Sequence, residues 1–243
     1  MRSLIFSRGQ AAGFGALIDN SVADLSAGLR CTECGHGVGA LRTLAARHGA
    51  DFPLSGSNGI RGYRPAVADP RQIFCVRLNH EEHLVEAGGA EAAFLTIFLR
   101  TSASHIRQGR PLIMPRKSDR FHCEREISVV IGRGGRRIAT EQAILHIPGF
   151  SCYNGLVDTA EIGENEVLTL ETRLNGEFIP LADTTKLIFA ISELLTYISA
   201  FSALFPGDVI VTSTPGRSGL QAPTAMLYAT WRPGRGQEDR HAA

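Results

Sequence analysis

Two glutamates separated by one residue open the most chemically informative segment of this chain. Glu124 and Glu126 stand directly before an apolar run over residues 127–131. Because the side chains of a β-strand alternate between its faces, two carboxylates at this spacing project to the same side. Carboxylates at the mouth of a buried strand are costly to desolvate unless a positive charge meets them. The spacing therefore predicts a site for a hard divalent cation, since Mg²⁺ is often held by one or two carboxylates plus water and substrate.

A histidine and a glutamate three residues apart form a second candidate site. His83 and Glu86 meet on one face if this segment is helical. A carboxylate beside an imidazole raises its basicity, which makes a general base for a water or a C–H proton. His80 and His83 are three residues apart, whereas the zinc-protease motif H-E-x-x-H needs four, so we exclude that motif. The alternative is a solvated helix face without catalytic function.

The cysteines and the bulk composition describe the setting of these groups. Cys31 and Cys34 lack the second ligand pair of a structural zinc site, and the five cysteines are odd in number and scattered, as in a reducing compartment. A formal charge of +1 gives no reason to expect nucleic acid or an anionic membrane as a partner. The N-terminus lacks the apolar core of a signal peptide, and no apolar stretch could span a bilayer. We therefore expect a cytoplasmic protein that is not associated with membranes.

The chain divides into two units and a tail. Residues 1–70 are predicted to form a small N-terminal α+β domain, with a helix over residues 38–47 and a linker over residues 53–70 that is rich in Pro, Gly, Ser and Asn. Residues 71–231 change to strands punctuated by turns and form the predicted catalytic domain. The polar, Pro/Gly-rich residues 232–243 are predicted to be a disordered tail.

Several elements of the larger unit can be predicted from local pattern. Asn175-Gly176 between two apolar runs predicts a type I′ hairpin. Apolar residues at helical spacing predict a helix over residues 188–205, with Ser192 as a candidate cap. The glycine-rich segment 132–136 stands between strand-like runs, which favours a hairpin into a second strand near Ile138 over a phosphate cradle. Residues 209–212 are predicted to be a buried strand.

The order of these motifs resembles the fumarylacetoacetate hydrolase family from residue 73 to about residue 219. The family motifs, in chain order, are N-Y-x-x-H-x-x-E, E-x-E before an apolar strand, G-[YF]-x-x-x-N-D, R-x-N-G-E, a helix of the form I-F-x-x-x-E-L-[IL]-x-Y-[IL]-S, and P-G-D-V-I-x-T-G-T-P. Matching residues are Asn79, His83 and Glu86; Glu124, Glu126 and residues 129–132; Gly149, Phe150 and Asn154; Arg173, Asn175, Gly176 and Glu177; residues 188–199; and residues 206–215, with Ser213 in place of the motif's glycine.

The resemblance implies a fold and a class of chemistry. The fold is α+β and mostly β, a mixed β-sandwich roll with flanking helices and a small N-terminal domain. Family members act on acylpyruvate-like substrates and oxaloacetate, by C–C hydrolysis, decarboxylation or tautomerisation, and usually pair as homodimers. The resemblance assigns His83 and Glu86 as the catalytic base dyad.

The resemblance also implies a metal site, with one departure. The family holds Mg²⁺ or Mn²⁺ with both glutamates of E-x-E, here Glu124 and Glu126, and with the aspartate of N-D, where this chain has Gly155. We therefore expect weak metal binding, with Asp158 as a substitute ligand; Glu161 is the alternative, and complete loss of the metal is another.

The substrate pocket departs from the family pattern as well. We assign substrate binding to Asn79, Arg100 and Thr214; Arg100 stands where the family has lysine, and His80 where it has tyrosine. The family's lysine-containing loop after N-D is not identified. These departures favour enolisation, dehydration or decarboxylation of a small 2-oxo acid or 1,3-dicarbonyl compound over C–C hydrolysis. The alternative is a metal-free isomerase or cyclase, or a non-catalytic binding or assembly subunit.

Overall fold

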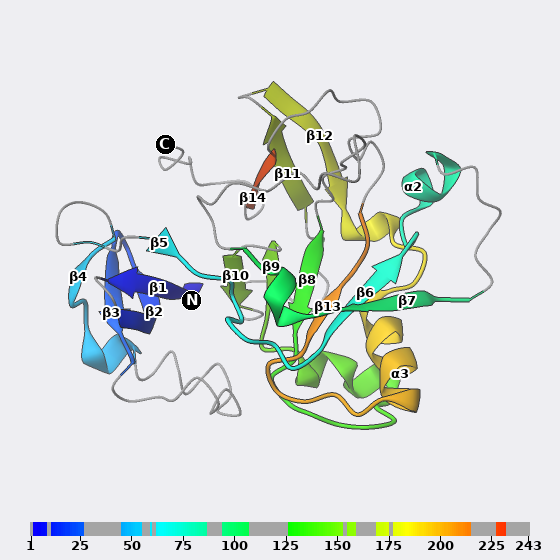
Figure 1. The fold of residues 1–243 in the computed structure, drawn as a ribbon, viewed down its shortest axis with the longest axis horizontal. Helices are drawn as coiled ribbons and strands as arrows, with labels where there is room; N and C mark the ends of the chain where they lie inside the picture. The colour runs from blue at the N-terminus through cyan, green and yellow to red at the C-terminus, as the bar shows by residue number, and fades with distance from the viewer. Residues whose placement is uncertain are drawn as a thin grey trace.

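The computed structural model describes residues 2–8, 11–26, 45–54, 59, 62–86, 94–106, 126–152, 155–158, 169–174, 177–214 and 227–231. Their strands form sheets of five, six and three strands (Figure 1). The α+β, mostly β architecture expected from the sequence is confirmed. The strands of the five-stranded sheet, in spatial order, are β4 (Phe52–Pro53), β3 (Ser21–Asp24), β2 (Ala11–Ile18), β1 (Arg2–Arg8) and β5 (Gly62–Tyr63).

The N-terminal sheet recruits two pieces of the predicted linker. β4 pairs with β3 and β5 pairs with β1, so the stretch 53–70 does not simply connect two domains. Both strands are only two residues long and contain or border Pro and Gly, which hides them from pattern reasoning. The predicted boundary at residue 70 lies between β5 and the next sheet. Of the predicted helix over residues 38–47, only 45–47 are described, within a helical turn at residues 45–48.

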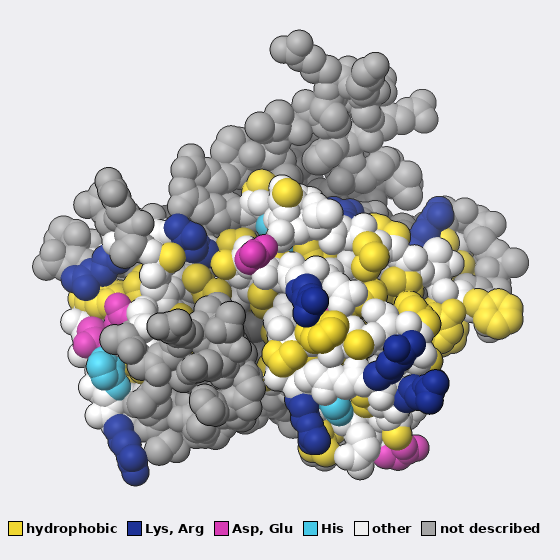
Figure 2. Space-filling view, turned by 60° about the horizontal axis from the view of Figure 1, so that its bottom comes forward, with side chains coloured by type: hydrophobic (Ala, Val, Ile, Leu, Met, Phe, Trp, Pro, Cys, Tyr) yellow, Lys and Arg dark blue, Asp and Glu magenta, His cyan; other side chains and the backbone are white. Residues whose placement is uncertain are grey.

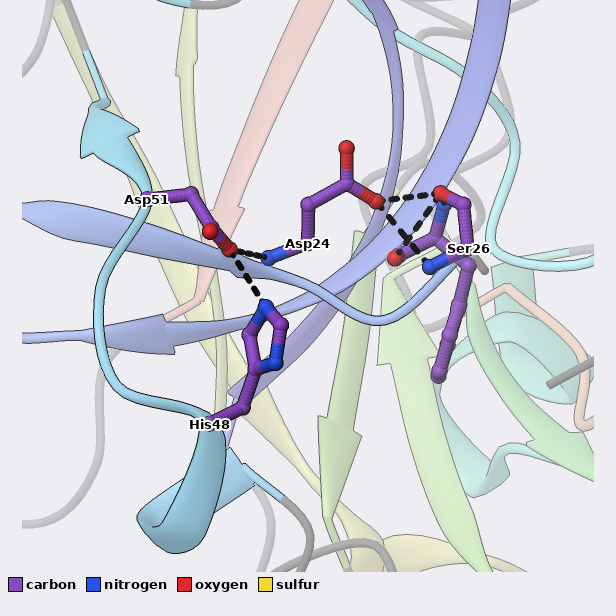
Figure 3. A network of polar contacts seen from close by, with 5 residues as sticks. Asp24, Ser26, His48 and Asp51 are labelled. Atoms are coloured by element: carbon purple, nitrogen blue, oxygen red, sulfur yellow. Dashed lines mark hydrogen bonds and ion pairs between the residues drawn. The ribbon is translucent and has the colours of Figure 1, made fainter. Parts of the chain in front are cut away.

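A polar network closes one end of this sheet (Figure 3). Asp51 accepts hydrogen bonds from the Asp24 backbone N–H at 2.6 Å and pairs with His48 Nε2 at 2.9 Å. The bond from the Asp24 N–H, more than the neighbouring imidazole, lowers the pKa of the Asp51 carboxyl. Ser26 donates its hydroxyl to the Asp24 carboxylate and accepts the Phe14 N–H at 3.0 Å. Because the contacts tie the segment 48–51 and Ser26 to strands β2 and β3, we assign the network a structural role.

The six-stranded sheet carries the main core. Its strands, in spatial order, are β10 (Gly155–Asp158), β9 (Gly149–Cys152), β8 (Ile127–Val130), β13 (Val209–Val211), β6 (Ile73–Arg77) and β7 (Thr96–Arg100). The pair β6–β13 is parallel and the other neighbours are antiparallel. Val129 and Ile210 are fully buried in one cluster with Leu195 and Ile198 of helix α3 (Ile191–Phe201), which therefore covers one face of the sheet.

A buried aspartate aligns the parallel pair. Asp208 accepts hydrogen bonds from the backbone N–H groups of Gln72 at 3.1 Å and Phe205 at 2.8 Å. Burial raises the pKa of the Asp208 carboxyl, while the same N–H donors act to lower it. Since Gln72 directly precedes β6 and Asp208 directly precedes β13, this carboxylate fixes the starts of both strands side by side.

Helix α3 is shorter than predicted and begins differently. It spans Ile191–Phe201, and the Glu193 carboxylate accepts the Ala190 N–H at 2.7 Å, so Glu193 and not Ser192 satisfies the first turn. Phe201, its last residue, is 55% exposed, and Phe205, within the predicted range but beyond the helix, is 37% exposed. Figure 2 shows such hydrophobic side chains at the surface among Lys and Arg side chains.

The predicted hairpin into a strand near Ile138 is wrong. β8 ends at Val130, and the following turn runs to the end of α3, where Gly135 forms a bridge with Leu204. The Ile138 N–H is bound by the Ser199 hydroxyl at 2.8 Å. The next segment is the 3₁₀ helix η3 (Thr140–His146). These partners are distant in sequence, so local pattern could not identify them.

The two strands predicted to flank Asn175-Gly176 are present in the structure and pair with each other. β11 (Thr169–Leu174) pairs with β12 (Glu177–Asp183), with Leu174 opposite Glu177, and β14 (Leu227–Trp231) completes this sheet. The backbone of these strands is described, but their side chains are not. The predicted tail at 232–243 lies outside the described residues. Among the described residues, no helix is long and apolar enough to cross a membrane.

Candidate active site

The ends of three central strands of the six-stranded sheet bring together three segments that are far apart in the sequence. β6 and β13 run parallel, with Val211 beside Cys75, so both strands end at this edge. β8 runs antiparallel to β13, with Val211 opposite Ser128, so β8 begins there. We call this group of strand ends the site edge; it comprises residues 78–80, 126–127 and 212–214.

Glu126 is a buried carboxylate at the site edge. Glu126 is only 9% exposed, and its Oε2 accepts a hydrogen bond from the backbone N–H of Ser213 at 2.7 Å. The Thr212 N–H and hydroxyl both bind the Ile127 carbonyl, at 3.0 and 3.1 Å, and hold the two segments in register. The bond from the Ser213 N–H is charge-assisted, and it orients a carboxylate that would otherwise be costly to bury. Glu124, its predicted partner, lies outside the described residues.

Asn79 joins the site edge to the segment before α3. Its side-chain Nδ2 donates to the carbonyls of Phe189 at 3.0 Å and Thr212 at 3.3 Å, and its Oδ1 accepts the Phe189 N–H at 2.8 Å. The residue is 1% exposed. Because its amide is engaged with the backbone, the observed contacts of Asn79 are structural, and its predicted substrate contact stays untested.

The site edge also holds two residues in a rarely populated backbone conformation. Leu78 has φ 54° and Ser213 has φ 95°. Non-glycine residues in this region are strained by about 1–3 kcal/mol each and persist where surrounding contacts determine them. Leu78 directly follows β6 and Ser213 lies two residues after the end of β13, so both of these strained residues lie at the same strand ends as Glu126.

The helix that carries the predicted base dyad begins at this edge. His83 and Glu86 lie in α2 (Glu81–Glu86), whose backbone is described while these two side chains are not. The helix is anchored on both sides of its start: His80 bridges to Leu187, and Lys186 Nζ binds the Glu82 carboxylate. The bond to Glu82 raises the pKa of Lys186. The structure thus places the dyad's helix beside the site edge and leaves the dyad's contacts as a prediction.

Two predicted site residues lie at the opposite edge. Arg100 pairs with Ile73, at the start of β6, and the β6–β7 pairing runs from there to Arg77. Asp158 pairs with Gly149, which itself pairs with Val130 at the far end of β8. Three strand residues span roughly 10 Å, so neither backbone position is near Glu126. The register gives no support to Arg100 as a substrate ligand or to Asp158 as a metal ligand, and we leave both out of the proposed site.

Gly155 and Thr214 lie at the correct end of the sheet. Gly155 pairs with Cys152, and Cys152 pairs with Ile127, the neighbour of Glu126. Thr214 is 3% exposed and follows Ser213. The family's third metal-binding carboxylate is missing because Gly155, which has no side chain, stands at its position. That position lies at the same strand ends as Glu126.

The described part of the site edge supplies one group of the type that binds magnesium or manganese. Glu126 supplies carboxylate oxygen, the ligand type these cations prefer, and the hydrogen bond from the Ser213 N–H orients that carboxylate. Within the described residues, no group of three or more His, Cys, Asp or Glu side chains is placed to hold a metal. A site here consequently depends on Glu124 and on oxygens from water and substrate.

The described cysteines offer no alternative nucleophile. Cys75 and Cys152 are buried thiols that form no disulfide, and burial raises the pKa of Cys152 to about 12. A thiol with this pKa is protonated at neutral pH, and the thiolate is the reactive form. Cys31, Cys34 and Cys123 lie outside the described residues.

Two residues of the site were not identified from the sequence. Ser213 binds Glu126 through its backbone N–H, across 87 positions of sequence. Lys186, which lies on the approach to α3, pairs with Glu82 across 104 positions. Neither contact leaves a local signal.

Comparisons with known proteins support the resemblance. The sequence matches the fumarylacetoacetate (FAA) hydrolase C-terminal family over residues 72–159 and 154–230. A relative from Rattus norvegicus, the mitochondrial oxaloacetate tautomerase Fahd2a, is 27% identical over 74% of this chain. The alignment spans 66% of that relative's length, just under two thirds.

Solved structures share the fold. Maleylpyruvate hydrolase from Sphingobium sp. SYK-6 superposes with a TM-score of 0.77 at 21% identity, over 95% of each chain. Its complex with manganese(II) ion and pyruvate gives a TM-score of 0.75 at 20% identity, over 95% of this chain and 98% of that one.

Proposed function

Because this chain belongs to the fumarylacetoacetate hydrolase family, we propose that it is an enzyme that tautomerises a small 2-oxo acid or related 1,3-dicarbonyl compound. The observation that carries the proposal is the buried Glu126 carboxylate, oriented by Ser213 beside the start of α2. A relative of 27% identity is named an oxaloacetate tautomerase, which supports keto–enol chemistry over C–C hydrolysis. So does the absence of the family's lysine loop from the sequence pattern.

The proposed reaction is a proton transfer between carbon and oxygen. His83, supported by Glu86, removes the proton from the carbon next to the substrate carbonyl, and a proton is returned to the carbonyl oxygen, so the substrate isomerises without losing atoms. Mg²⁺ or Mn²⁺ held by Glu124 and Glu126 would polarise that carbonyl. The Asn79 amide donates to the Thr212 carbonyl at 3.3 Å, which links the start of α2 to the segment whose Ser213 N–H binds Glu126.

A second candidate function rests on Gly155. Its backbone occupies the position at the site edge where the family motif has a metal-binding aspartate. A protein with only two metal carboxylates is the expected starting point for metal-free isomerisation by His83 and Glu86, or for a non-catalytic binding or assembly role.

An assay of enol-to-keto conversion of oxaloacetate distinguishes these functions. We expect turnover with Mn²⁺ that EDTA abolishes, and a fall in kcat of roughly 10²–10⁴-fold in His83→Gln, because general acid–base catalysis contributes on this scale. His48→Gln, a histidine of the N-terminal network, is the matched control and should keep full activity. Turnover that survives EDTA but is lost in His83→Gln would support the metal-free isomerase. No turnover under any condition would support the non-catalytic role.

We also propose that the protein is a homodimer that pairs through β7. This strand is the outer strand of its sheet, and Phe98 and Leu99 are exposed on opposite faces of it, by 40% and 63%. An edge strand with apolar side chains on both faces is a template for pairing with another chain, and a second copy meets it with the same surface. The cytoplasmic location predicted from the sequence is likewise a proposal.

The dimer can be tested by light scattering after size exclusion. Leu99→Glu is expected to shift the protein from dimer to monomer, because it places a charge at the centre of the apolar edge. Leu145→Glu, which changes an equally exposed leucine on η3, is the control and should leave the mass of the dimer unchanged. A wild-type protein that is monomeric at micromolar concentration would contradict the proposal.

A further inference from the structure

Ser213 adopts a backbone conformation that glycine would adopt without strain. Its φ is 95°, and the residue is 3% exposed. A side chain in this region costs conformational free energy, which persists only where surrounding contacts over-determine it. We therefore expect the contacts of the Ser213 side chain to offset the strain of this backbone conformation.

The two polar groups of Ser213 bind two different segments of the site edge. Its backbone N–H donates to Glu126 Oε2 at 2.7 Å, and its hydroxyl oxygen accepts the backbone N–H of Asn79 at 3.0 Å. A glycine at this position would keep the first bond and lose the second. The hydroxyl is thus the group that connects the carboxylate to the Asn79 backbone.

The Asn79 backbone leads directly into the helix of the base dyad. The next residue, His80, provides the carbonyl that accepts the Leu84 N–H of α2 at 2.9 Å. The Asn79 carbonyl binds the Ile188 N–H at 3.0 Å, so the segment is held from both sides. Removing the Ser213 hydroxyl would leave a buried N–H at Asn79 without its acceptor, which costs more than the loss of an exposed hydrogen bond.

We propose that Ser213 is a positioning residue whose hydroxyl couples the Glu126 carboxylate to the start of α2, so that the metal-binding group and the base dyad keep a fixed relative geometry. The inference rests on the proposed function for its catalytic consequence. The contacts on which the coupling depends are independent of it. The hydroxyl does not touch substrate in this account; it acts through Asn79.

The test compares Ser213→Gly and Ser213→Ala with Ser128→Ala. Ser128 is an equally buried serine of β8 whose hydroxyl donates to the Ser151 carbonyl at 3.0 Å, away from α2. The measurements are thermal unfolding, hydrogen exchange of peptides covering α2, Mn²⁺ affinity, and kcat and KM with oxaloacetate. Ser213→Gly relieves the backbone strain and should fold even if Ser213→Ala is less stable.

We expect both Ser213 variants to lose the coupling despite their different stabilities. Hydrogen exchange in α2 should quicken by about 5-fold or more, because the start of the helix loses a buried hydrogen bond. The kcat should fall roughly 10-fold with KM nearly unchanged, since small misplacement of a catalytic group reduces the chemical step. Mn²⁺ affinity should stay within about twofold of the wild-type value, because the bond from the Ser213 N–H to Glu126 is kept. Ser128→Ala should change none of these beyond its effect on stability.

The outcomes separate this inference from the proposed function. If Ser213→Gly unfolds at a higher temperature than Ser213→Ala and yet both lose kcat and α2 protection equally, a merely structural role is contradicted. If Ser213→Gly keeps wild-type kcat and α2 exchange, the positioning role is overturned. If the wild-type protein has no turnover, the proposed function fails, and hydrogen exchange in α2 still decides whether the hydroxyl couples the two segments.

Discussion

Replacing Glu126 with glutamine is expected to remove Mn²⁺-dependent turnover, with kcat/KM lowered by about 10²–10³-fold, a loss of several kcal/mol of charge stabilisation. Glutamine is nearly isosteric, and its side-chain oxygen can still accept the Ser213 N–H that binds Glu126 Oε2 at 2.7 Å. The fold is therefore preserved while the negative charge is lost. Mn²⁺ titration by calorimetry and the oxaloacetate assay measure the two consequences in parallel.

The control for this charge change is Glu141→Gln, which alters an exposed glutamate of η3 on the same domain. It should bind Mn²⁺ and turn over substrate as the wild type does. Full activity in Glu126→Gln, with an unchanged melting temperature, would contradict a metal site at this edge and support the metal-free isomerase. Loss of folding instead of activity would point to Glu126 as a structural carboxylate.

Replacing Gly155 with aspartate is expected to tighten Mn²⁺ binding by about 10-fold or more, because carboxylate count is a main determinant of affinity for hard cations. The register places Gly155 beside Cys152 and Cys152 beside Ile127, at the strand ends where Glu126 lies. The variant restores the residue type that the family motif has there. Electron paramagnetic resonance of Mn²⁺ measures the affinity directly, without requiring turnover.

Two variants make this prediction specific. Gly155→Asn adds a side chain of the same shape without the charge and should bind Mn²⁺ no more tightly than the wild type. Asp158→Asn removes a carboxylate from the opposite edge, where Asp158 pairs with Gly149, and should leave affinity unchanged. If Asp158→Asn weakens binding while Gly155→Asp does not tighten it, Asp158 is a ligand after all and the assignment of the site edge is wrong.

Much of the local structure could be predicted from pattern alone. The apolar run after Glu126, the Asn-Gly hairpin and the buried strand at Val209–Val211 each follow from side-chain periodicity or turn chemistry within a few residues. Helix α3 followed in the same way, although its bounds at Ile191 and Phe201 lie inside the predicted range of 188–205. The strand expected near Ile138 was wrong, because the partner of that segment is α3, far along the chain.

The sequence by itself determined the types and spacing of the chemical groups and, through the order of the motifs, the family. Only the tertiary structure decided which of them meet. Asn79 and Ser213 are 134 positions apart, and they touch because β6 and β13 pair in parallel, a contact with no local signal. The pairing of β7 with β6 places Arg100 at the opposite strand ends, and the pairing of β10 with β9 does the same for Asp158. Residue type therefore specified the chemistry available to this protein, and strand pairing decided where that chemistry is assembled.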